Sequence, residues 1–301
     1  MEELMNCQMA TTDREKPRTK LNRLRGHLKR FLSHPLNCIS VSVVTAMVLM
    51  AVFAPLIAPY HYAQVNTAEQ WQGPSARHWL GTDQYGRDIL SRVIYGSQIS
   101  LLVGFTTVCL AMFIGVIVGS ISGYFRGKVD EIIMRIVEVF MAIPGIVLAL
   151  AIVSVLGPSV VNVIIAISVY RITQFARVTR GAFLSVMAMD YIEACRAQGL
   201  GGARIMFLHA LPNCIGPIVV LATVLMGNVI LSEATLSFLG LGIQPPLASW
   251  GVMIKDGNEY LMFAPWMSVW PGVFLLITMM AFNLLGDGLR DFLDPRGRSV
   301  L

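Results

Sequence analysis

Apolar residues dominate this chain, and they gather in six runs separated by polar intervals. A helix needs about 20 mainly apolar residues to cross a bilayer, and several of the runs reach that length. The runs cover roughly residues 37–57, 99–121, 131–156, 160–175, 215–238 and 267–285. The pattern predicts an all-α integral membrane protein with six transmembrane helices.

Composition and charge support the same interpretation. Of the 301 residues, 55% are hydrophobic and 14% are charged, whereas an ordinary soluble domain has about 25% charged residues. Placing the N-terminus inside puts 19 of the 23 lysines and arginines in cytoplasmic segments. The positive-inside rule therefore predicts cytoplasmic termini, and the asymmetry accounts for the net charge of +5 without a nucleic-acid partner.

This topology divides the chain into five expected segments. They are a cytoplasmic N-terminal tail (1–36), a first transmembrane helix (37–58), an external loop (59–96), a transmembrane domain (97–286) and a cytoplasmic C-terminal tail (287–301). Within the first tail, residues 21–31 predict either a basic helix on anionic lipid or a plain solvated segment. Arg171, Arg177 and Arg180 mark the expected cytoplasmic end of the fourth span.

Two features inside the spans predict how the helices meet and bend. Gly115, Gly119 and Gly123 stand four residues apart, so one face of the second span is flat and can approach another helix closely. Helix packing is the simpler explanation of this face, and a substrate path is the alternative. In the third span, Pro144 and Gly145 predict a kink.

Polar residues occur inside two of the predicted spans, and those of the fifth span are candidates for an intramembrane site. Glu131, Arg135 and Glu138 lie on one face of the third span, where pairing at i,i+3 and i,i+4 reduces the cost of partial burial. The fifth span carries Asn228 and Glu233, and a carboxylate at the bilayer centre costs about 2.5–3.5 kcal/mol. Glu233 lies near the outer end, where the cost is lower. A functional site and a structural hydrogen bond to a neighbouring helix both remain open.

The chain offers no recognisable catalytic or metal-binding constellation. Its five cysteines show no CxxC pairing, which favours free thiols, and its five histidines are scattered. The segment GYFRGKV lacks the spacing and the Ser or Thr of a phosphate loop, and HExxH is absent. We therefore expect no metal, no catalytic residue and no ATP chemistry in this chain itself.

The longest polar interval in the second half of the chain runs from Asp190 to Pro212. Asp190 is a candidate N-cap, and Glu193 follows three residues later as in a capping box. Gly199 is a natural helix stop, after which residues 203–210 predict a second short helix limited by Pro212. From spacing alone, an amphipathic connector lying on the bilayer explains the stretch equally well.

The same stretch resembles the EAA loop of permease subunits of binding-protein-dependent ABC importers. The residues that match the family pattern are Glu193, Ala194, Gly199, Ile205, Leu211 and Pro212. The pattern is broken at Cys195, where the family usually has a second alanine. In that family this loop, here residues 185–212, is the coupling helix that docks into a cytoplasmic ATPase. The resemblance implies that Glu193 bonds to the ATPase and that Gly199 sets the bend.

A second resemblance narrows the family to one subgroup. The string GTDQYGRDILSR (81–92) is similar to the external loop of dipeptide, oligopeptide and nickel importer permeases, and residues 231–246 and 283–298 resemble the same subgroup. The resemblance makes the external loop a candidate docking site outside the membrane. The residues that would carry this role are Asp83, Gly86, Arg87 and Asp88. Arg87 is expected to pair with Asp88.

Together these resemblances imply the type I ABC importer (MetI-like) permease fold and a bacterial inner-membrane location. The family implies two ATPase subunits that bind ATP and Mg²⁺, a homologous second permease, an external substrate-binding protein and membrane lipid as partners. Closure of the ATPases on ATP would move the coupling helix and switch the pathway by alternating access.

The substrate stays open, because the binding protein mostly selects it in this family. Short peptides are the leading expectation, with a nickel chelate, glutathione or another small solute as alternatives. An ion-coupled secondary transporter is a rival class, supported only by the kink at Pro144 and by Glu233. An intramembrane enzyme is a further rival, and it would need a nucleophile–base pair or metal set that the sequence lacks.

Overall fold

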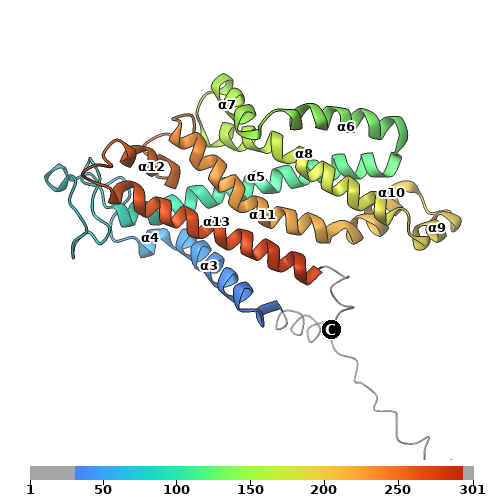
Figure 1. The fold of residues 1–301 in the computed structure, drawn as a ribbon, viewed down its shortest axis with the longest axis horizontal. Coiled ribbons are helices and arrows are strands. Elements are labelled where there is room, and N and C mark those ends of the chain that lie inside the picture. The colour runs from blue at the N-terminus through green and yellow to red at the C-terminus, as the bar shows by residue number, and fades with distance from the viewer. Residues whose placement is uncertain (1–30, 294–301) are drawn as a thin grey trace, which may run out of the picture.

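The structure is a computed structural model that describes residues 31–293 (Figure 1). Within that range the regular structure is helical, with one isolated bridge between Thr82 and Asp88 and no strand. Five helices are long and apolar enough to cross a bilayer. They are α3 (Pro35–Val52), α5 (Ile89–Phe125), α8 (Val160–Val186), the continuous helix Gly202–Phe238 that includes α11 (Leu211–Phe238), and α13 (Trp266–Leu293).

A sixth span consists of two helices, α6 (Gly127–Ala142) and α7 (Gly145–Leu156), which are bent by 87° at the break between them. The predicted kink is therefore a complete break, at which Ile143 and Pro144 have ψ angles of 129° and 128°. With this pair counted as one span, the predicted six-span all-α membrane fold is confirmed. The shorter elements are α4 (Ala54–Ile57), η1 (Thr67–Glu69), α9 (Asp190–Ala197), α10 (Gly202–Arg204), η2 (Ile205–Ala210) and α12 (Trp250–Asn258).

The two ends of the bundle carry different connections. α9 and α10 lie at one end, and α12 lies with the loop between α4 and α5 at the opposite end (Figure 1). α3 runs toward the loop end, and α13 runs from there back toward the end that carries α9. This arrangement places α9 on the side where α3 begins and α13 ends, which is the side that the positive-inside rule assigns to the cytoplasm.

The face formed by Gly115, Gly119 and Gly123 packs against α8, as the sequence predicts, and all three glycines are buried. A Cβ placed on Gly115 would lie 2.4 Å from the Cβ of Phe175. One placed on Gly119 would lie 2.4 Å from the carbonyl oxygen of Ala176. Such distances are too short for real atoms, so only glycine permits this approach of the two helices. Packing thus explains the glycine face.

Two helices extend beyond the expected limits of their spans. α5 begins at Ile89, because Asp88 caps it: the carboxylate accepts hydrogen bonds from the backbone N–H and from the hydroxyl of Ser91, both at 2.7 Å. Residues 89–96, expected at the end of the external loop, are therefore the first turns of α5. α13 continues to Leu293, so residues 287–293 of the expected cytoplasmic tail are helical. Residues 1–30 and 294–301, with most of the expected basic helix, lie outside the described residues.

α8 is longer than the expected fourth span, which stops at Phe175. A helix of about 16 residues is only about 24 Å long, too short for a hydrocarbon core of about 30 Å. The helix instead continues to Val186. Arg171 therefore lies well inside α8, and the expectation that it marks the cytoplasmic end is wrong.

The second short helix expected at residues 203–210 is not a separate element. Gly202–Phe238 is one continuous helix of 37 residues, and Pro212 does not limit it. Residues Ile205–Ala210 form a π-helical turn within it. Proline has no N–H, so Pro212 cannot bond to the carbonyl of Leu208, and a wider turn accommodates the missing bond.

Candidate functional site

α9 is a short helix that one buried side chain holds in place. Ile192 is completely buried in the core of the bundle. Glu193, Ala194 and Ala197 are exposed, so the small-residue face is free to meet another surface. Cys195, the departure from the family pattern, is half-buried and packs against the core. Since a helix of eight residues is marginal by itself, the packing of Ile192 and Cys195 against the core helps to keep α9 ordered.

The start of α9 differs from the expected capping box. Asp190 is the first helical residue, and the N-cap is Met189, whose side chain makes no capping bond. The expectation that Asp190 is the N-cap is therefore wrong. Asp190 and Glu193 both lie in the first turn, where negative charge is favourable beside the positive end of the helix dipole.

Gly199 ends α9 as the sequence predicts. Its φ of +76° lies in the left-handed region, which glycine adopts without steric cost. The N–H of Gly199 donates to the carbonyl of Arg196 at 2.9 Å, and the N–H of Leu200 donates to the carbonyl of Cys195 at 3.2 Å. These two bonds form a Schellman motif, which turns the chain sharply toward the helix that follows.

Two contacts fix α9 and the turn against the bundle. The Tyr191 hydroxyl donates to the carbonyl of His209 at 3.4 Å and accepts from the side-chain amide of Asn213 at 3.1 Å. Partial burial raises the pKa of Tyr191 above its ordinary value of 10.0, so the phenol is protonated at neutral pH and can donate. Gly202 lies against Tyr124 of α5, whose hydroxyl would be 2.3 Å from an added Cβ.

The remaining residues of the EAA-like pattern lie in the helix after the turn. Ile205 is buried in the same core as Ile192, Leu211 is half-buried and Pro212 is exposed. The pattern thus includes one buried core residue, Ile205, one helix stop, Gly199, and two exposed residues on α9, Glu193 and Ala194. α9 and α10, which flank the turn at Gly199, lie at one end of the molecule (Figure 1), and η2 and the first residues of α11 continue directly from α10.

The external loop is held together by buried ion pairs. Asp83 accepts a hydrogen bond from Nε of Arg87 at 2.6 Å and another from Nη1 of Arg92 at 3.2 Å. Asp88 is 2.9 Å from Nδ1 of His78, in addition to its capping of α5. The expected pair between Arg87 and Asp88 is therefore wrong, because each residue has a different partner.

This loop buries the residues that were expected to dock a partner. Asp83, Arg87 and Asp88 are all buried. A Cβ on Gly86 would lie 1.8 Å from the carbonyl oxygen of Asn66, so this glycine is required by a close backbone approach. The motif stabilises the conformation of the loop. Trp71, Trp79 and Tyr85 are exposed aromatic side chains beside it.

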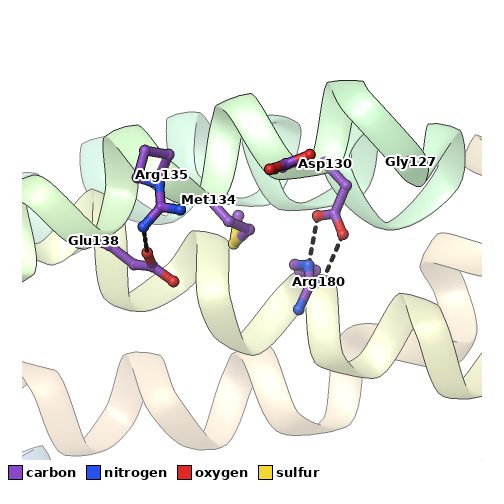
Figure 2. A pocket seen from close by; sticks show the side chains of 7 residues that line it. Gly127, Asp130, Met134, Arg135, Glu138 and Arg180 are labelled. Carbon is purple, nitrogen blue, oxygen red and sulfur yellow. Dashed lines mark hydrogen bonds and ion pairs between the residues drawn. The ribbon is translucent and has the colours of Figure 1, made fainter.

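At the opposite end, a cavity of about 390 Å³ lies beside α6 and α8 (Figure 2). Asp130 accepts two hydrogen bonds of 2.5 Å from Arg180, one at each carboxylate oxygen. Arg135 and Glu138 pair at 3.5 Å, which confirms the predicted contact between them. The Asp130–Arg180 pair was not predicted, because spacing along one helix says nothing about a partner 50 residues away.

Glu233 on α11 is completely buried, and its carboxyl group bonds within the protein. It accepts hydrogen bonds from the hydroxyl of Ser100 on α5 at 3.2 Å and from that of Ser237 at 2.8 Å. Asn228 donates to the carbonyl of Val224 on its own helix at 3.1 Å. The carboxyl group of Glu233 thus joins α11 to α5, as expected if its role is a structural hydrogen bond to a neighbouring helix.

Sequence reasoning did not select Arg171, which lines a smaller cavity between α7, α8 and α11. The available signal was the length of the fourth span: about 16 residues are too few to cross a bilayer, and extending the helix to a sufficient length places Arg171 well inside it. Among the described residues, no group of three or more His, Cys, Asp or Glu side chains is placed to hold a metal ion, and four cysteines are free thiols.

Comparison with known protein families gives two matches. Residues 115–299 match the binding-protein-dependent transport system inner membrane component, and residues 22–74 match the N-terminal transmembrane domain of oligopeptide transport permease C. This chain belongs to the first of these families. The permease is therefore a non-catalytic membrane subunit of an ABC importer in the bacterial inner membrane, and ATP hydrolysis belongs to ATPase partners.

Curated relatives align with nearly the whole permease. It is 42% identical to the dipeptide transport system permease protein DppC of Alkalihalophilus pseudofirmus, over 93% of this chain and 92% of the relative. It is 41% identical to the di/tripeptide permease DppC of Pseudomonas aeruginosa, over 83% and 84%. The glutathione permease GsiD of Pectobacterium atrosepticum is 40% identical, over 90% of both chains.

A solved structure confirms the fold of the permease. A chain of the MetNI methionine ABC transporter, in an inward-facing conformation, aligns with a TM-score of 0.57 and 21% identity. The alignment covers 68% of the permease and 98% of the MetNI chain. The expected type I importer permease fold is therefore confirmed.

Proposed function

We propose that this permease forms half of a translocation pathway for di- and oligopeptides. The observation that carries the substrate class is the group of relatives named for dipeptides and di/tripeptides, which align over 83–93% of the chain at 41–42% identity. Relatives named for glutathione align at 40–42% identity, so glutathione is the second candidate. A nickel chelate rests only on the sequence resemblance.

We further propose that α9 is the coupling helix that docks into a cleft on a cytoplasmic ATPase. The exposed face of Glu193, Ala194 and Ala197 supports this assignment, because small side chains let a partner approach and a carboxylate offers it a hydrogen-bond acceptor. Phe207 and Leu208 in the adjoining helix are also exposed, although both are large and apolar. Exposed apolar groups beside a polar rim are typical of a protein interface.

The connections of α9 suggest how its movement reaches the membrane. Ile192 ties α9 to the buried core, and the turn at Gly199 leads into one continuous helix, Gly202–Phe238. A helix of 37 residues is about 55 Å long. Because Pro212 does not end this helix, a displacement at its cytoplasmic end can pass along one element into the bilayer. ATP binding to the partner would supply the differential binding energy that any change of state needs.

The complete transporter in this proposal has five protein chains. Two ATPase subunits bind ATP and Mg²⁺, a homologous second permease completes the pathway, and an external binding protein delivers the peptide. The binding protein would meet the outer end of the permease, where Trp79 and Tyr85 are exposed. Within this permease, residues 97–286 form the transmembrane domain, and residues 185–212 form the coupling loop.

Reconstitution of the purified complex in liposomes tests the proposal. With the binding protein outside and ATP inside, we expect uptake of a labelled dipeptide that stops when ATP is withheld. Uptake of glutathione and not of dipeptides would show that glutathione is the substrate, and it would leave the proposed coupling to ATP hydrolysis unchanged. Uptake that persists without ATP and collapses with an ion gradient would contradict the scheme itself.

A further inference from the structure

Arg171 is a permanent cation at the middle depth of a transmembrane helix. It lies 11 residues after the first residue of α8 and 15 before the last, which places it about 17 Å from one end and about 23 Å from the other. Both distances are large beside a hydrocarbon core of about 30 Å. An arginine at this depth is costly unless it meets a partner, lines water or serves a function.

The contacts of Arg171 leave its charge without a counter-charge. One terminal nitrogen donates to the amide oxygen of Gln174 at 3.0 Å, and the other donates to the hydroxyl of Ser232 at 3.1 Å. Both acceptors are neutral, and the buried Nε has no hydrogen-bond partner. None of the ion pairs within residues 31–293 includes Arg171. By contrast, Arg180 on the same helix is paired with Asp130.

The guanidinium group lines a cavity of about 210 Å³ between three helices. Gly145 and Ala149 contribute to it from α7, Tyr170 and Arg171 from α8, and Ser232 from α11. A Cβ on Gly145 would lie 2.7 Å from the ring of Tyr170, so the break between α6 and α7 brings the backbone directly against this ring. The cavity is large enough for a carboxylate and its water, and α7 begins at the break beside it.

We propose that Arg171 binds the terminal carboxylate of the transported peptide as it passes through the membrane. The inference rests on the proposed peptide substrate, since every unmodified linear peptide carries this group whatever its side chains. Gln174 and Ser232 hold the guanidinium in one orientation, and its planar fork then presents the remaining N–H groups to a carboxylate. A single positive charge that binds the carboxylate common to all linear peptides suits a pathway that transports peptides of many different sequences.

The test uses the assembled transporter with its binding protein, ATPases and second permease. Arg171→Gln removes the charge, Arg171→Lys keeps it, and Arg177→Gln is the matched control, because Arg177 is an exposed arginine on the same helix. Three quantities are measured for each: uptake of a labelled dipeptide, ATP hydrolysis stimulated by the loaded binding protein, and recovery of the second permease on purification. The loss of one charge-assisted contact should lower uptake about tenfold or more in Arg171→Gln.

The supporting result has three parts. Arg171→Gln loses uptake while stimulated ATP hydrolysis and subunit recovery stay near wild type, Arg171→Lys retains a substantial part of uptake, and Arg177→Gln is unaffected. Unchanged uptake in Arg171→Gln, or equal loss in Arg171→Lys, would overturn the site. Loss of the second permease would overturn it too, because it would assign Arg171 to an ion pair between subunits. If the wild-type transporter imports no peptide, the proposed peptide substrate is wrong, and the proposed role of Arg171 is wrong as well.

Discussion

Arg180 in the second half of α8 donates two hydrogen bonds to Asp130 in the first turn of α6 (Figure 2). The pair joins the first half of the broken span to the helix that leads into the coupling loop. Ser122 at the end of α5 donates to the same carboxylate. One carboxyl group therefore holds three helices together at the cytoplasmic end of the permease.

Replacing Asp130 should loosen this junction. Asp130→Asn keeps the size of the side chain and removes the charge, and we expect it to lower the free energy of unfolding by about 1–2 kcal/mol, since hydrogen bonds to charged groups are stronger than neutral ones. Thermal unfolding of the purified protein in detergent measures the change. The matched control is Glu138→Gln, which breaks the exposed pair with Arg135 in the same cavity and should have almost no effect. Equal losses in both variants would contradict this account of the junction.

Gly119 should tolerate no side chain. Gly119→Leu would drive atoms into the backbone of α8 at Ala176, and overpacking of this kind costs about 1–3 kcal/mol or more. We expect a low yield of folded protein and a reduced melting temperature. Gly181→Ala is the control, because nothing lies within 4 Å of its added Cβ and alanine favours a helix. A Gly119→Leu variant as stable as wild type would show that the packing is looser than described.

Gly199 should be needed for coupling and not for membrane insertion. Gly199→Asp forces an L-residue into a φ of +76°, at a cost of roughly 1–2 kcal/mol, which corresponds to about a 5- to 30-fold shift away from the native turn. We expect normal insertion, ATP hydrolysis that continues, and uptake reduced by a similar factor.

Two further variants test the reason for that effect. Gly201 has a φ of −63° and open space around it, so Gly201→Asp should couple normally. Gly199→Asn should be milder than Gly199→Asp, because asparagine enters the left-handed region more readily. Uptake that is unchanged in Gly199→Asp would count against the coupling assignment.

Two substitutions of Glu233 distinguish a structural role of its carboxyl group from a role in transport. Glu233→Ala leaves the hydroxyls of Ser100 and Ser237 without their acceptor, and we expect a loss of about 1–3 kcal/mol. Glu233→Gln keeps the shape and one acceptor oxygen, so it should be close to wild type in both stability and uptake. If Glu233→Gln abolished uptake and left the melting temperature unchanged, the carboxyl group would belong to the transport pathway.

The sequence allowed three correct predictions, because each depends on local chemistry. The apolar runs predicted the number of spans. The four-residue spacing of glycines predicted the packing face that includes Gly119, and the glycine after a short helix predicted the helix stop at Gly199. The limits of the helices were less predictable. Asp88 caps α5 from beside its first turn, and Arg171 lies well inside α8. The apolar pattern predicted neither position.

The sequence pattern could not predict which polar residues pair with each other in the folded protein. Arg87 was expected to bond to its neighbour Asp88, but the folded loop gives it Asp83. Asp130 likewise finds Arg180 on another helix. Such choices depend on which side chains the fold brings together in space, and no spacing along one element contains that information.

The docking of α9 into an ATPase is the central claim, and cross-linking tests it most directly. Ala194→Cys, made in a chain whose other cysteines are replaced, puts a thiol on the exposed face of α9, and Trp79→Cys is the matched control on the opposite end of the molecule. A short bifunctional reagent applied to the assembled transporter should join the cysteine at position 194 to an ATPase subunit, with a yield that changes when ATP binds, and should leave the one at position 79 unlinked to it. Labelling of the cysteine at position 194 by an impermeant reagent from outside intact cells, or the absence of any link to an ATPase, would contradict the account.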